Sequence, residues 1–359
     1  RPDIIVILAD DLGFGDVGFS APRRASSGAP SDRYPTVWDT PALDDWARAS
    51  VVLDRLYTHR WCAPSRAALL TGRYAQSSLK IDAYGPHLQL DSAHGTKTLP
   101  GTLRAAGYRT GHVGKWHLSG NDAVSRKLLD GHDPTAGKLL NTTPLAIGFE
   151  SSFGFISGGS TYWPHRGKGR KGATGWMRIN GGSLRSATQP RLYATDALGN
   201  AAVSFIAAAT DDPRPYFLYL APNAPHAPFQ AKKNDVLSSV CARYHQQRGD
   251  GGQGFRNATY CGMVKALDRL AGRVRDAISA LPPSRSRNTL VLFASDNGPD
   301  NSPWVAKSAA EKDDLSKWRR SPGVALPLIG CKGTNFDGGL RSPAFVSWPA
   351  LAYDRSAHT

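Results

Sequence analysis

Hard oxygen ligands follow two apolar stretches of this sequence. Asp10 and Asp11 come directly after the first stretch, and Asp296 and Asn297 follow the second. Carboxylate and amide oxygens suit Ca²⁺ or Mg²⁺ and argue against a zinc site, which would use His or Cys ligands. Asp and Asn also cap turns after strands, but two such pairs after two apolar stretches favour a metal site.

A cysteine begins the segment Cys62-Ala-Pro-Ser-Arg66, and the short apolar run after it ends at Thr-Gly-Arg73. Pro64 can begin a helix here, which places Cys62 at the helix N-terminus. Unpaired backbone N–H groups and the helix dipole favour an anionic oxygen at that position. The segment therefore suits chemistry on a negatively charged group.

Two lysines and two histidines stand in short polar segments elsewhere. Lys115 and His117 lie in Gly-Lys-Trp-His, His226 lies in Pro-His-Ala-Pro, and Lys332 stands beside a glycine. Taken singly, a histidine in a proline-rich turn is typical of a surface position, and a lysine beside glycine is typical of a solvated loop. Their place in an ordered set of candidate residues favours a functional role.

Hydrophobic periodicity predicts the scaffold for these residues. Thr40 and Pro41 begin one helix as cap and first residue, and Gly107 ends another. Strands alternating with helices predict an α/β domain with a largely parallel or mixed sheet, which binds ligands at the carboxyl ends of its strands. We expect strands at residues 3–9, 52–57, 108–113, 216–221, 289–294 and 343–348, and helices at 98–106, 198–209 and 260–278.

The charge balance favours an anionic partner. The chain carries 44 Lys and Arg against 29 Asp and Glu, a net charge of +15 over 359 residues. No zinc-finger spacing, heptad or aromatic RNA-binding motif is present, which argues against nucleic acid. No apolar run reaches the ~20 residues that cross a bilayer. The basic excess is therefore explained by an anionic substrate or by a solvated surface. One domain is expected over residues 1–359.

Residues 151–190 differ from the rest of the chain. They are rich in Gly and Ser, contain no Asp or Glu, and are expected to form a mobile basic loop. His165 is a candidate for substrate contact within it, and residues 20–39 are expected to form another surface loop. The basic residues of the segment are Arg166, Lys168, Arg170, Lys171, Arg178 and Arg185.

The cysteines and two candidate glycosylation tripeptides indicate the cellular compartment of the protein. A disulfide could join Cys241 and Cys261, with a stabilisation of ~3 kcal/mol. Cys331 has no evident partner. Asn141 and Asn257 stand in Asn-x-Thr tripeptides, which fit a secreted or lysosomal chain.

The Cys62 segment resembles the signature of the type I sulfatases, in which this cysteine is oxidised to formylglycine (3-oxoalanine). By this resemblance the chain is identified as a member of that family, nearest to the arylsulfatase B (N-acetylgalactosamine 4-sulfatase) branch. The implied fold is the alkaline-phosphatase-like one. The family's landmarks appear in order as Asp10-Asp11, Cys62, Lys115 with His117, His226, Asp296-Asn297, Lys332 and Asp337-Gly-Gly-Leu-Arg341.

The resemblance also implies roles for these residues. One Ca²⁺ would be held by Asp10, Asp11, Asp296, Asn297 and the modified Cys62. Arg66 and Lys115 would hold the formylglycine oxygens, and Asp337 with Arg341 would form a salt-bridged turn.

The implied reaction proceeds through a covalent sulfate hemiacetal. One hydroxyl of the aldehyde hydrate attacks sulfur, and His226 protonates the leaving oxygen. Lys332 and Lys115 neutralise the sulfate oxygens. His117 then takes the second hydroxyl proton, so that the aldehyde forms again and sulfate leaves. The substrate would be a sulfated small molecule or polysaccharide, and a formylglycine-generating enzyme would act during maturation.

Two alternatives remain open at this point. The first is a phosphoryl hydrolase, either a formylglycine-dependent phosphonate or phosphodiester hydrolase or a two-metal phosphatase. The two-metal form is disfavoured, because Asn297 stands where a zinc-type Asp-His-Gly motif has His and no Thr or Ser occupies position 62. The second is a catalytically silent relative that binds polyanions. The start at Arg1 favours a processed chain or an excerpt. The resemblance implies a smaller C-terminal antiparallel subdomain, most of which is expected to be absent before Thr359, so that either the chain is partial or this subdomain is reduced.

Overall fold

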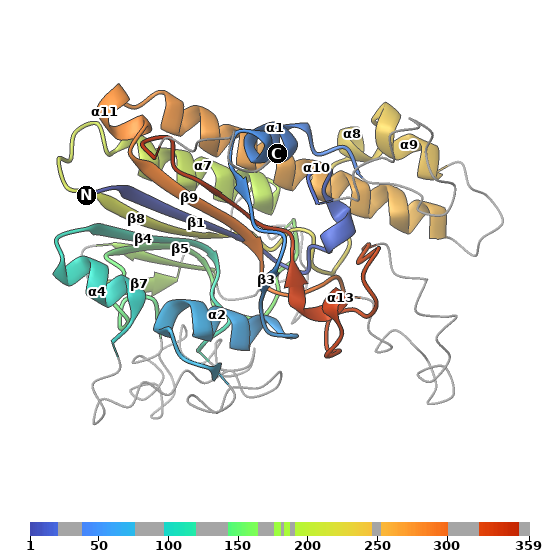
Figure 1. Ribbon diagram of the computed structural model, residues 1–359, viewed down its shortest axis with the longest axis horizontal. Coiled ribbons are helices and arrows are strands. Elements are labelled where there is room, and N and C mark those ends of the chain that lie inside the picture. The colour runs from blue at the N-terminus through green and yellow to red at the C-terminus, as the bar shows by residue number, and fades with distance from the viewer. Residues whose placement is uncertain are drawn as a thin grey trace.

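A mixed β-sheet with helices on both faces forms the body of the protein (Figure 1). The computed structural model describes residues 1–20, 38–75, 97–119, 143–163, 176–180, 183–186, 191–245, 253–300 and 323–351. Within these residues the strand order is β2-β11-β9-β1-β8-β4-β5-β6-β7. The strands are β1 (Asp3–Ala9), β2 (Val51–Val52), β4 (Arg109–Lys115), β5 (Ser151–Phe155), β6 (Trp176–Asn180), β7 (Ser183–Ser186), β8 (Tyr216–Ala221), β9 (Thr289–Ser295) and β11 (Phe345–Ser347).

The centre of this sheet is parallel and its edges are antiparallel. Strand β1 pairs in parallel with β8 and β9, and β4 pairs in parallel with β8 and β5. At the edges, β11 runs antiparallel to β9 and β2, and β6 runs antiparallel to β5 and β7. The predicted α/β fold class with a mostly parallel mixed sheet is therefore confirmed.

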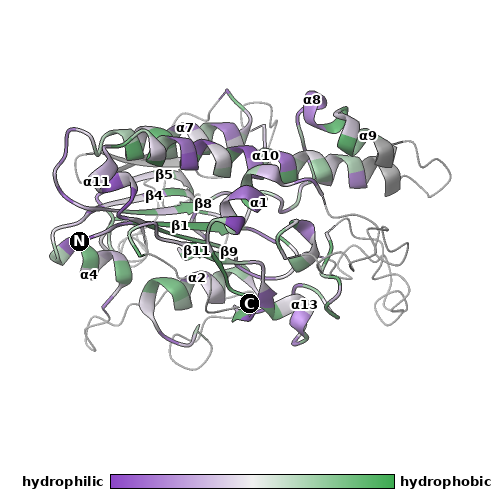
Figure 2. Ribbon diagram, turned by 45° about the horizontal axis from the view of Figure 1, so that its top comes forward, coloured by the Kyte–Doolittle hydropathy of each residue, from purple (hydrophilic) through white to green (hydrophobic). Residues whose placement is uncertain are grey.

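Strand β1 is buried because its apolar side chains serve both faces of the sheet. Ile5 and Ile7 pack into one core with helices α10 (Gln253–Ser279) and α7 (Ala194–Ala207), whereas Val6 and Leu8 pack into a second core with α2 (Cys62–Thr71). Figure 2 shows the apolar colouring that runs along the central strands. The continuous apolar run is thus the signature of a strand covered on both sides.

The helices form two layers. In Figure 1 α7, α10, α1 (Pro41–Arg48) and α11 (Pro283–Ser286) lie over one face of the sheet, and α2 with α4 (Leu99–Ala105) lies over the other. Shorter elements include the 3₁₀ helix η1 (Phe14–Asp16) and the helices α8 (Lys233–Val236), α9 (Ser239–His245) and α13 (Asp337–Leu340). No helix among the described residues has the length and apolar character needed to cross a membrane.

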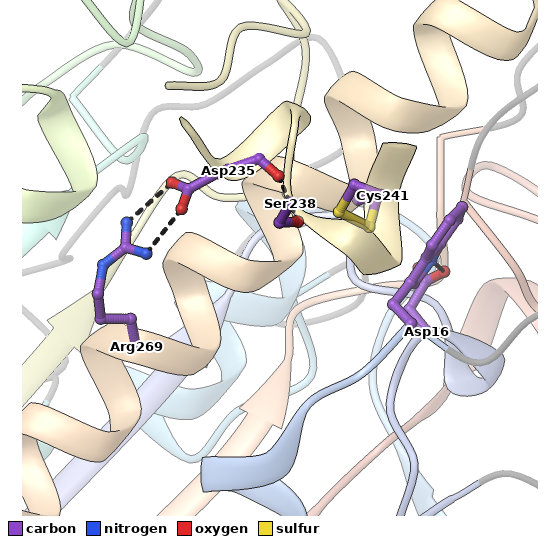
Figure 3. The surroundings of a disulfide bond; sticks show 7 residues. Asp16, Asp235, Ser238, Cys241 and Arg269 are labelled. Carbon is purple, nitrogen blue, oxygen red and sulfur yellow. Dashed lines mark hydrogen bonds and ion pairs between the residues drawn. A yellow bond between two sulfur atoms is a disulfide. The ribbon is translucent and has the colours of Figure 1, made fainter. Parts of the chain in front are cut away.

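The predicted disulfide is confirmed. It joins Cys241 of α9 to Cys261 of α10, with the two Cα atoms 5.6 Å apart (Figure 3). Beside it, the carboxylate of Asp235 accepts two hydrogen bonds from Arg269 at 2.9 and 3.0 Å. Together these contacts fasten the short helices α8 and α9 to the long helix α10.

The expectation of a loop over residues 151–190 is wrong for much of that range. Strand β5 pairs with β4, and β6 and β7 extend the sheet beyond it. Trp176 is only 2% exposed and lies against Phe153 and Phe155. A Gly-rich sequence forms strands here because a neighbouring strand supplies the pairing. The basic residues 166, 168, 170 and 171, His165 and most of residues 20–39 lie outside the described residues.

One smaller expectation also changes. Residues 52–57 do not form one strand, since β2 joins the main sheet whereas β3 (Leu56–Tyr57) pairs with β10 (Arg341–Ser342). The expected ion pair of Arg341 with Asp337 is present at 4.0 Å, and Arg341 also has a closer partner in the carboxylate of Asp54 at 2.7 Å. The exposed turn at Asp54 separates the two strands and gives Arg341 this closer partner.

Candidate active site

The candidate residues from six segments meet at one edge of the sheet. Strands β1, β4, β8 and β9 are parallel, so their carboxyl ends lie on the same side. Helix α2 brings Cys62 to that side from the helical layer below the sheet. The site draws on Asp10 and Asp11 after β1, Lys115 and His117 at the end of β4, His226 after β8, Asp296 and Asn297 after β9, and Lys332 before α13.

Each of three buried carboxylates has one buried cation as its nearest charged partner, and Arg66 also lies 3.6 Å from Asp10. The donor atoms lie 2.6 to 3.0 Å from the carboxylate oxygens, and each side chain is 6% exposed or less. The formal charges of the three pairs cancel. The pairs are Asp10 with Lys115, Asp11 with Lys332, and Asp296 with Arg66.

Backbone contacts hold the ends of β1 and β9 together. Asp11 adopts a left-handed conformation with φ of 63°, which turns the chain sharply after the strand. Its N–H donates to Asp296 Oδ1 at 3.2 Å, and the N–H of Leu12 donates to Ser295 Oγ at 3.0 Å. The two pairs of oxygen-bearing residues are therefore fixed against each other by more than their own side chains.

The site has the donor set of a hard cation. One oxygen each of Asp10 and Asp296 and the sulfur of Cys62 lie within 4.8 Å of one another. The buried Oδ1 of Asn297 has no hydrogen-bond partner among the described residues, because the amide donates through Nδ2 to Asp11 and to the carbonyl of Gly298. A buried acceptor without a donor is costly. A divalent cation at this point would remove that cost.

The pKa shifts of two carboxyl groups in the cluster also favour a cation site. Burial, together with the negative charge of Asp10, raises the pKa of Asp296 to about 6 against the attraction of Arg66. Burial also disfavours the charged form of Asp10, but Lys115 and the other cations outweigh it and lower the pKa of that carboxyl. Adjacent buried carboxylates thus compete for the available positive charge, and a bound cation would relieve the competition.

Cys62 is the first residue of α2, so the helix begins two residues earlier than the predicted start at Pro64. Proline fits the first turn because no intrahelical bond needs its missing N–H there. The side chain is buried, and burial raises the pKa of the thiol although Lys115 and Lys332 oppose this. An unmodified Cys62 is therefore a protonated thiol rather than a reactive thiolate.

The two histidines of the site differ in environment. His117 has φ of 59° and a buried Nδ1 without a partner in the described part of the chain. Burial, then the charges of Lys115 and Arg66, lowers its pKa well below the ordinary value, so its ring is neutral. His226 donates from Nδ1 to the carbonyl of Ala227, and its Nε2 lies 3.7 Å from the Asp11 carboxylate.

Sequence reasoning missed the residues beneath this cluster. The hydroxyl of Tyr219 accepts a hydrogen bond from Arg66 at 3.3 Å. His112 lies 3.3 Å through Nε2 from the carbonyl of Lys115 and 2.8 Å through Nδ1 from Ser152 Oγ, and burial lowers its pKa to about 3. Both side chains alternate with apolar residues inside strands, so only their polar character could have distinguished them.

The fold and the site define an alkaline-phosphatase-like α/β protein with a metal-type cluster beside a helix N-terminus. The sequence profile of the Sulfatase family matches residues 2–358. The chain therefore belongs to the sulfatase family, as the Cys62 segment and its companions predicted.

Relatives agree with this membership. The chain is 29% identical to arylsulfatase J of Mus musculus over 356 residues, which cover 98% of this chain and 48% of the relative. It is 30% identical to N-acetylgalactosamine-6-sulfatase of Rattus norvegicus over 369 residues, with coverage of 97% and 57%. The chain thus spans about half the length of these curated relatives.

Solved structures show the same fold. The crystal structure of Ps i-CgsB in complex with k-i-k-neocarrahexaose aligns with a TM-score of 0.69 and 30% identity, and covers 97% of this chain and 66% of that one. The PsFucS1 sulfatase from Pseudoalteromonas sp. aligns with a TM-score of 0.66 at 23% identity and supports the fold alone.

Proposed function

We propose that this protein hydrolyses sulfate esters, with a formylglycine made from Cys62 as the nucleophile and one Ca²⁺ as cofactor. The observation that carries the proposal is the position of Cys62. Its sulfur lies within 4.8 Å of carboxylate oxygens of Asp10 and Asp296, at the start of a helix and inside a ring of cations. An oxygen on the Cβ atom of residue 62 would therefore face both the proposed metal ligands and the lysines.

The oxygen-rich donor set and the buried acceptor of Asn297 favour Ca²⁺ over a softer metal. When bound, the ion would polarise the nucleophile and the sulfate oxygens near it. The protein's part is to hold the ligands in place, which the backbone bond from Asp11 to Asp296 does at 3.2 Å. The ligands would be Asp10, Asp11, Asp296, Asn297 and the modified Cys62.

The local charge fits an anionic substrate. Three carboxylates and three cations cancel in the buried cluster, so a divalent cation would leave the site with an excess of two positive charges. A sulfate ester carries one negative charge and would be attracted to this excess. Lys115 and Lys332 are the cations placed to neutralise sulfate oxygens, and Arg66 orients Asp296.

Formylglycine would supply what the cysteine lacks. A buried, protonated thiol is a poor nucleophile, whereas an aldehyde hydrate offers one hydroxyl to attack sulfur and a second whose proton drives release of the sulfate. His117 is the proposed acceptor of that second proton, because its neutral ring offers a nitrogen lone pair and its buried Nδ1 has no partner among the described residues. Lys115 and Arg66 would hold the hydrate oxygens.

His226 is the proposed acid for the leaving alcohol. Its Nδ1 donates to the carbonyl of Ala227, which leaves Nε2 on the side of Asp11. As the S–O bond breaks, the proton on Nε2 moves to the leaving oxygen, and the ring returns to neutrality.

The substrate class proposed is a sulfated carbohydrate. The support is the net charge of +15 and the similarity to N-acetylgalactosamine-6-sulfatase and to Ps i-CgsB, solved with k-i-k-neocarrahexaose. The disulfide of Cys241 with Cys261 favours an oxidising compartment, which supports a secreted or lysosomal location. A formylglycine-generating enzyme would be the maturation partner.

The test is turnover by protein co-expressed with a formylglycine-generating enzyme. We expect hydrolysis of 4-nitrophenyl sulfate well above that of 4-nitrophenyl phosphate, and an aldehyde instead of a thiol in the peptide of residues 61–66. Cys62→Ala is the matched control and should turn over neither ester. A clear preference for phosphate would favour the phosphoryl hydrolase. A persistent thiol, with sulfated polysaccharide bound but not cleaved, would favour the silent relative.

A further inference from the structure

A buried tyrosine outside the motifs of the site contacts the turn that carries His226. Tyr162 is 0% exposed, and its hydroxyl lies 2.5 Å from the carbonyl oxygen of Asn223 and 2.9 Å from that of His226. The hydroxyl has one proton, which these two carbonyls share. They mark the two ends of a turn that closes through a 2.9 Å bond from the N–H of His226 to Asn223.

Tyr162 is itself held firmly. Its N–H donates to Gln230 Oε1 at 2.9 Å, and its carbonyl accepts from the N–H of Ala194 at 2.8 Å. Its ring stacks on that of Tyr193 with the centroids 5.3 Å apart. Burial, followed by the charges of Tyr193, Asp10 and Asp11, raises the pKa of Tyr162 well above its ordinary value, so its hydroxyl stays a donor.

The ring of His226 has separate constraints. The bond from Nδ1 to Ala227 sets which nitrogen faces the site. A Cβ built on Gly159 would lie 3.5 Å from Cε1 of His226, so the backbone at Gly159 packs closely against the ring. These contacts limit rotation of the ring, but none of them sets the height of the turn above the sheet. The turn is held by the Tyr162 hydroxyl at both of its ends, by the Asn223 amide at the carbonyl of Ser160, and by the N–H of Asp10, which donates to the carbonyl of Ala224 at 3.3 Å.

We propose that Tyr162 is a positioning residue for proton transfer, whose hydroxyl holds the Asn223–His226 turn where Nε2 of His226 reaches the leaving oxygen. This inference rests on the acid role proposed for His226. A displaced acid matters most when the leaving group is a weak acid, because such an alcohol cannot depart as an anion. Loss of the hydroxyl should therefore impair reactions with poor leaving groups selectively.

The experiment uses Tyr162→Phe, which keeps the stacked ring, and a series of phenyl sulfates from 4-nitrophenyl to 4-methylphenyl. We expect kcat/KM to fall less than about 3-fold for the 4-nitrophenyl ester and about 10-fold or more for the 4-methylphenyl ester. Tyr193→Phe is the matched control, since its hydroxyl donates to the carbonyl of Gln230 and not to the turn. It should leave the leaving-group dependence unchanged.

His226→Ala separates the inference from the proposed function. If His226→Ala steepens the leaving-group dependence and Tyr162→Phe lowers all esters equally or none, the positioning role is refuted. If His226→Ala shows no such selectivity, the acid role fails and the inference fails with it. Combined with His226→Ala, Tyr162→Phe should have no further selective effect.

A second variant keeps the test available if Tyr162→Phe does not fold. Asn223→Ala removes the 3.3 Å bond from Asn223 Nδ2 to the carbonyl of Ser160, another anchor of the same turn. It should steepen the leaving-group dependence in the same direction. An equal loss across the series would count against the inference.

Discussion

A buried carboxylate lies at each end of strand β1, Asp3 at its start and Asp10 directly after it, and the two differ in their surroundings. At the amino end, Asp3 accepts two hydrogen bonds from Arg285 at 2.7 and 2.9 Å and one from the backbone of Tyr216 at 2.9 Å. At the carboxyl end, Asp10 shares its surroundings with Asp11 and Asp296. Both carboxylates have a cationic partner, but Asp10 also lies beside two further buried carboxylates, whereas no second carboxylate is paired with Arg285 at Asp3 among the described residues.

The difference separates a structural ion pair from a site built for a ligand. Arg285 also donates to the carbonyls of Ala209, Asp212 and Arg214, so it ties together loops at the base of the sheet. At the carboxyl end, Oδ1 of Asn297 has no donor within the described part of the chain. Three buried carboxylates side by side are costly even when each has a cation, and a divalent cation between them would offset part of that cost.

The largest difference between the two ends of the sheet is expected in catalytic activity. Asp296→Asn removes a proposed metal ligand and the carboxylate that orients Arg66, and we expect kcat/KM to fall by about 10³-fold. Asp3→Asn at the other end should change kcat by less than about 3-fold, because it is far from the reacting groups. Steady-state turnover of 4-nitrophenyl sulfate checks both. Equal losses would remove the distinction between the two ends.

Removal of the metal should destabilise the carboxyl end. With free Ca²⁺ at 100 times its Kd, bound metal contributes about 2.7 kcal/mol to the free energy of unfolding. Chelation should therefore lower the unfolding temperature of the wild-type protein, and added Ca²⁺ should restore it. The Asp3→Asn variant should keep this response, whereas Asp296→Asn should lose it. A chelator effect that survives in Asp296→Asn would place the metal elsewhere.

The amino end should matter for stability alone. Arg285→Ala leaves Asp3 buried without its cation and three carbonyls without a donor, and we expect a loss of about 2–3 kcal/mol in the free energy of unfolding. Urea unfolding measures the loss. Turnover at a temperature where the variant stays folded should match that of the wild type, and a fall in kcat there would contradict the comparison.

The smallest effect expected is a pH dependence beneath the carboxyl end. His112 has a pKa of about 3 when folded and about 6.5 when unfolded, so the unfolded chain binds its proton first. Its contribution to stability is present above pH 6.5 and is lost as the pH falls from there toward 3. Acid should therefore destabilise the wild type more than His112→Gln, which cannot titrate. Urea unfolding at pH 7 and pH 5 checks the difference, and equal acid sensitivity would argue against a neutral, buried His112.

The local parts of the site could be predicted from the sequence. The apolar runs that form β1 and β9 predict buried strands. When these strands are parallel, the polar residues that follow them must lie at the same edge of the sheet. Cys62 ahead of Pro64 likewise indicates a helix start. These inferences succeed because strand burial, helix capping and oxygen ligation depend on neighbouring residues.

Contacts over long sequence distances could not be predicted. Lys332 and Asp11 stand 321 residues apart and Arg66 and Tyr219 stand 153 apart, and nothing local links either pair. Strands β6 and β7 arose in a segment expected to be a loop, because their pairing depends on the edge that β5 offers.

The sequence by itself determined the fold class, the family and the set of chemical groups at the site. Only the tertiary structure decided which cation pairs with which carboxylate, which amide oxygen lacks a donor, and that Tyr162 contacts the turn of His226. The physical reason is that such contacts form where packed elements bring distant residues within hydrogen-bond reach, and sheet order sets those distances.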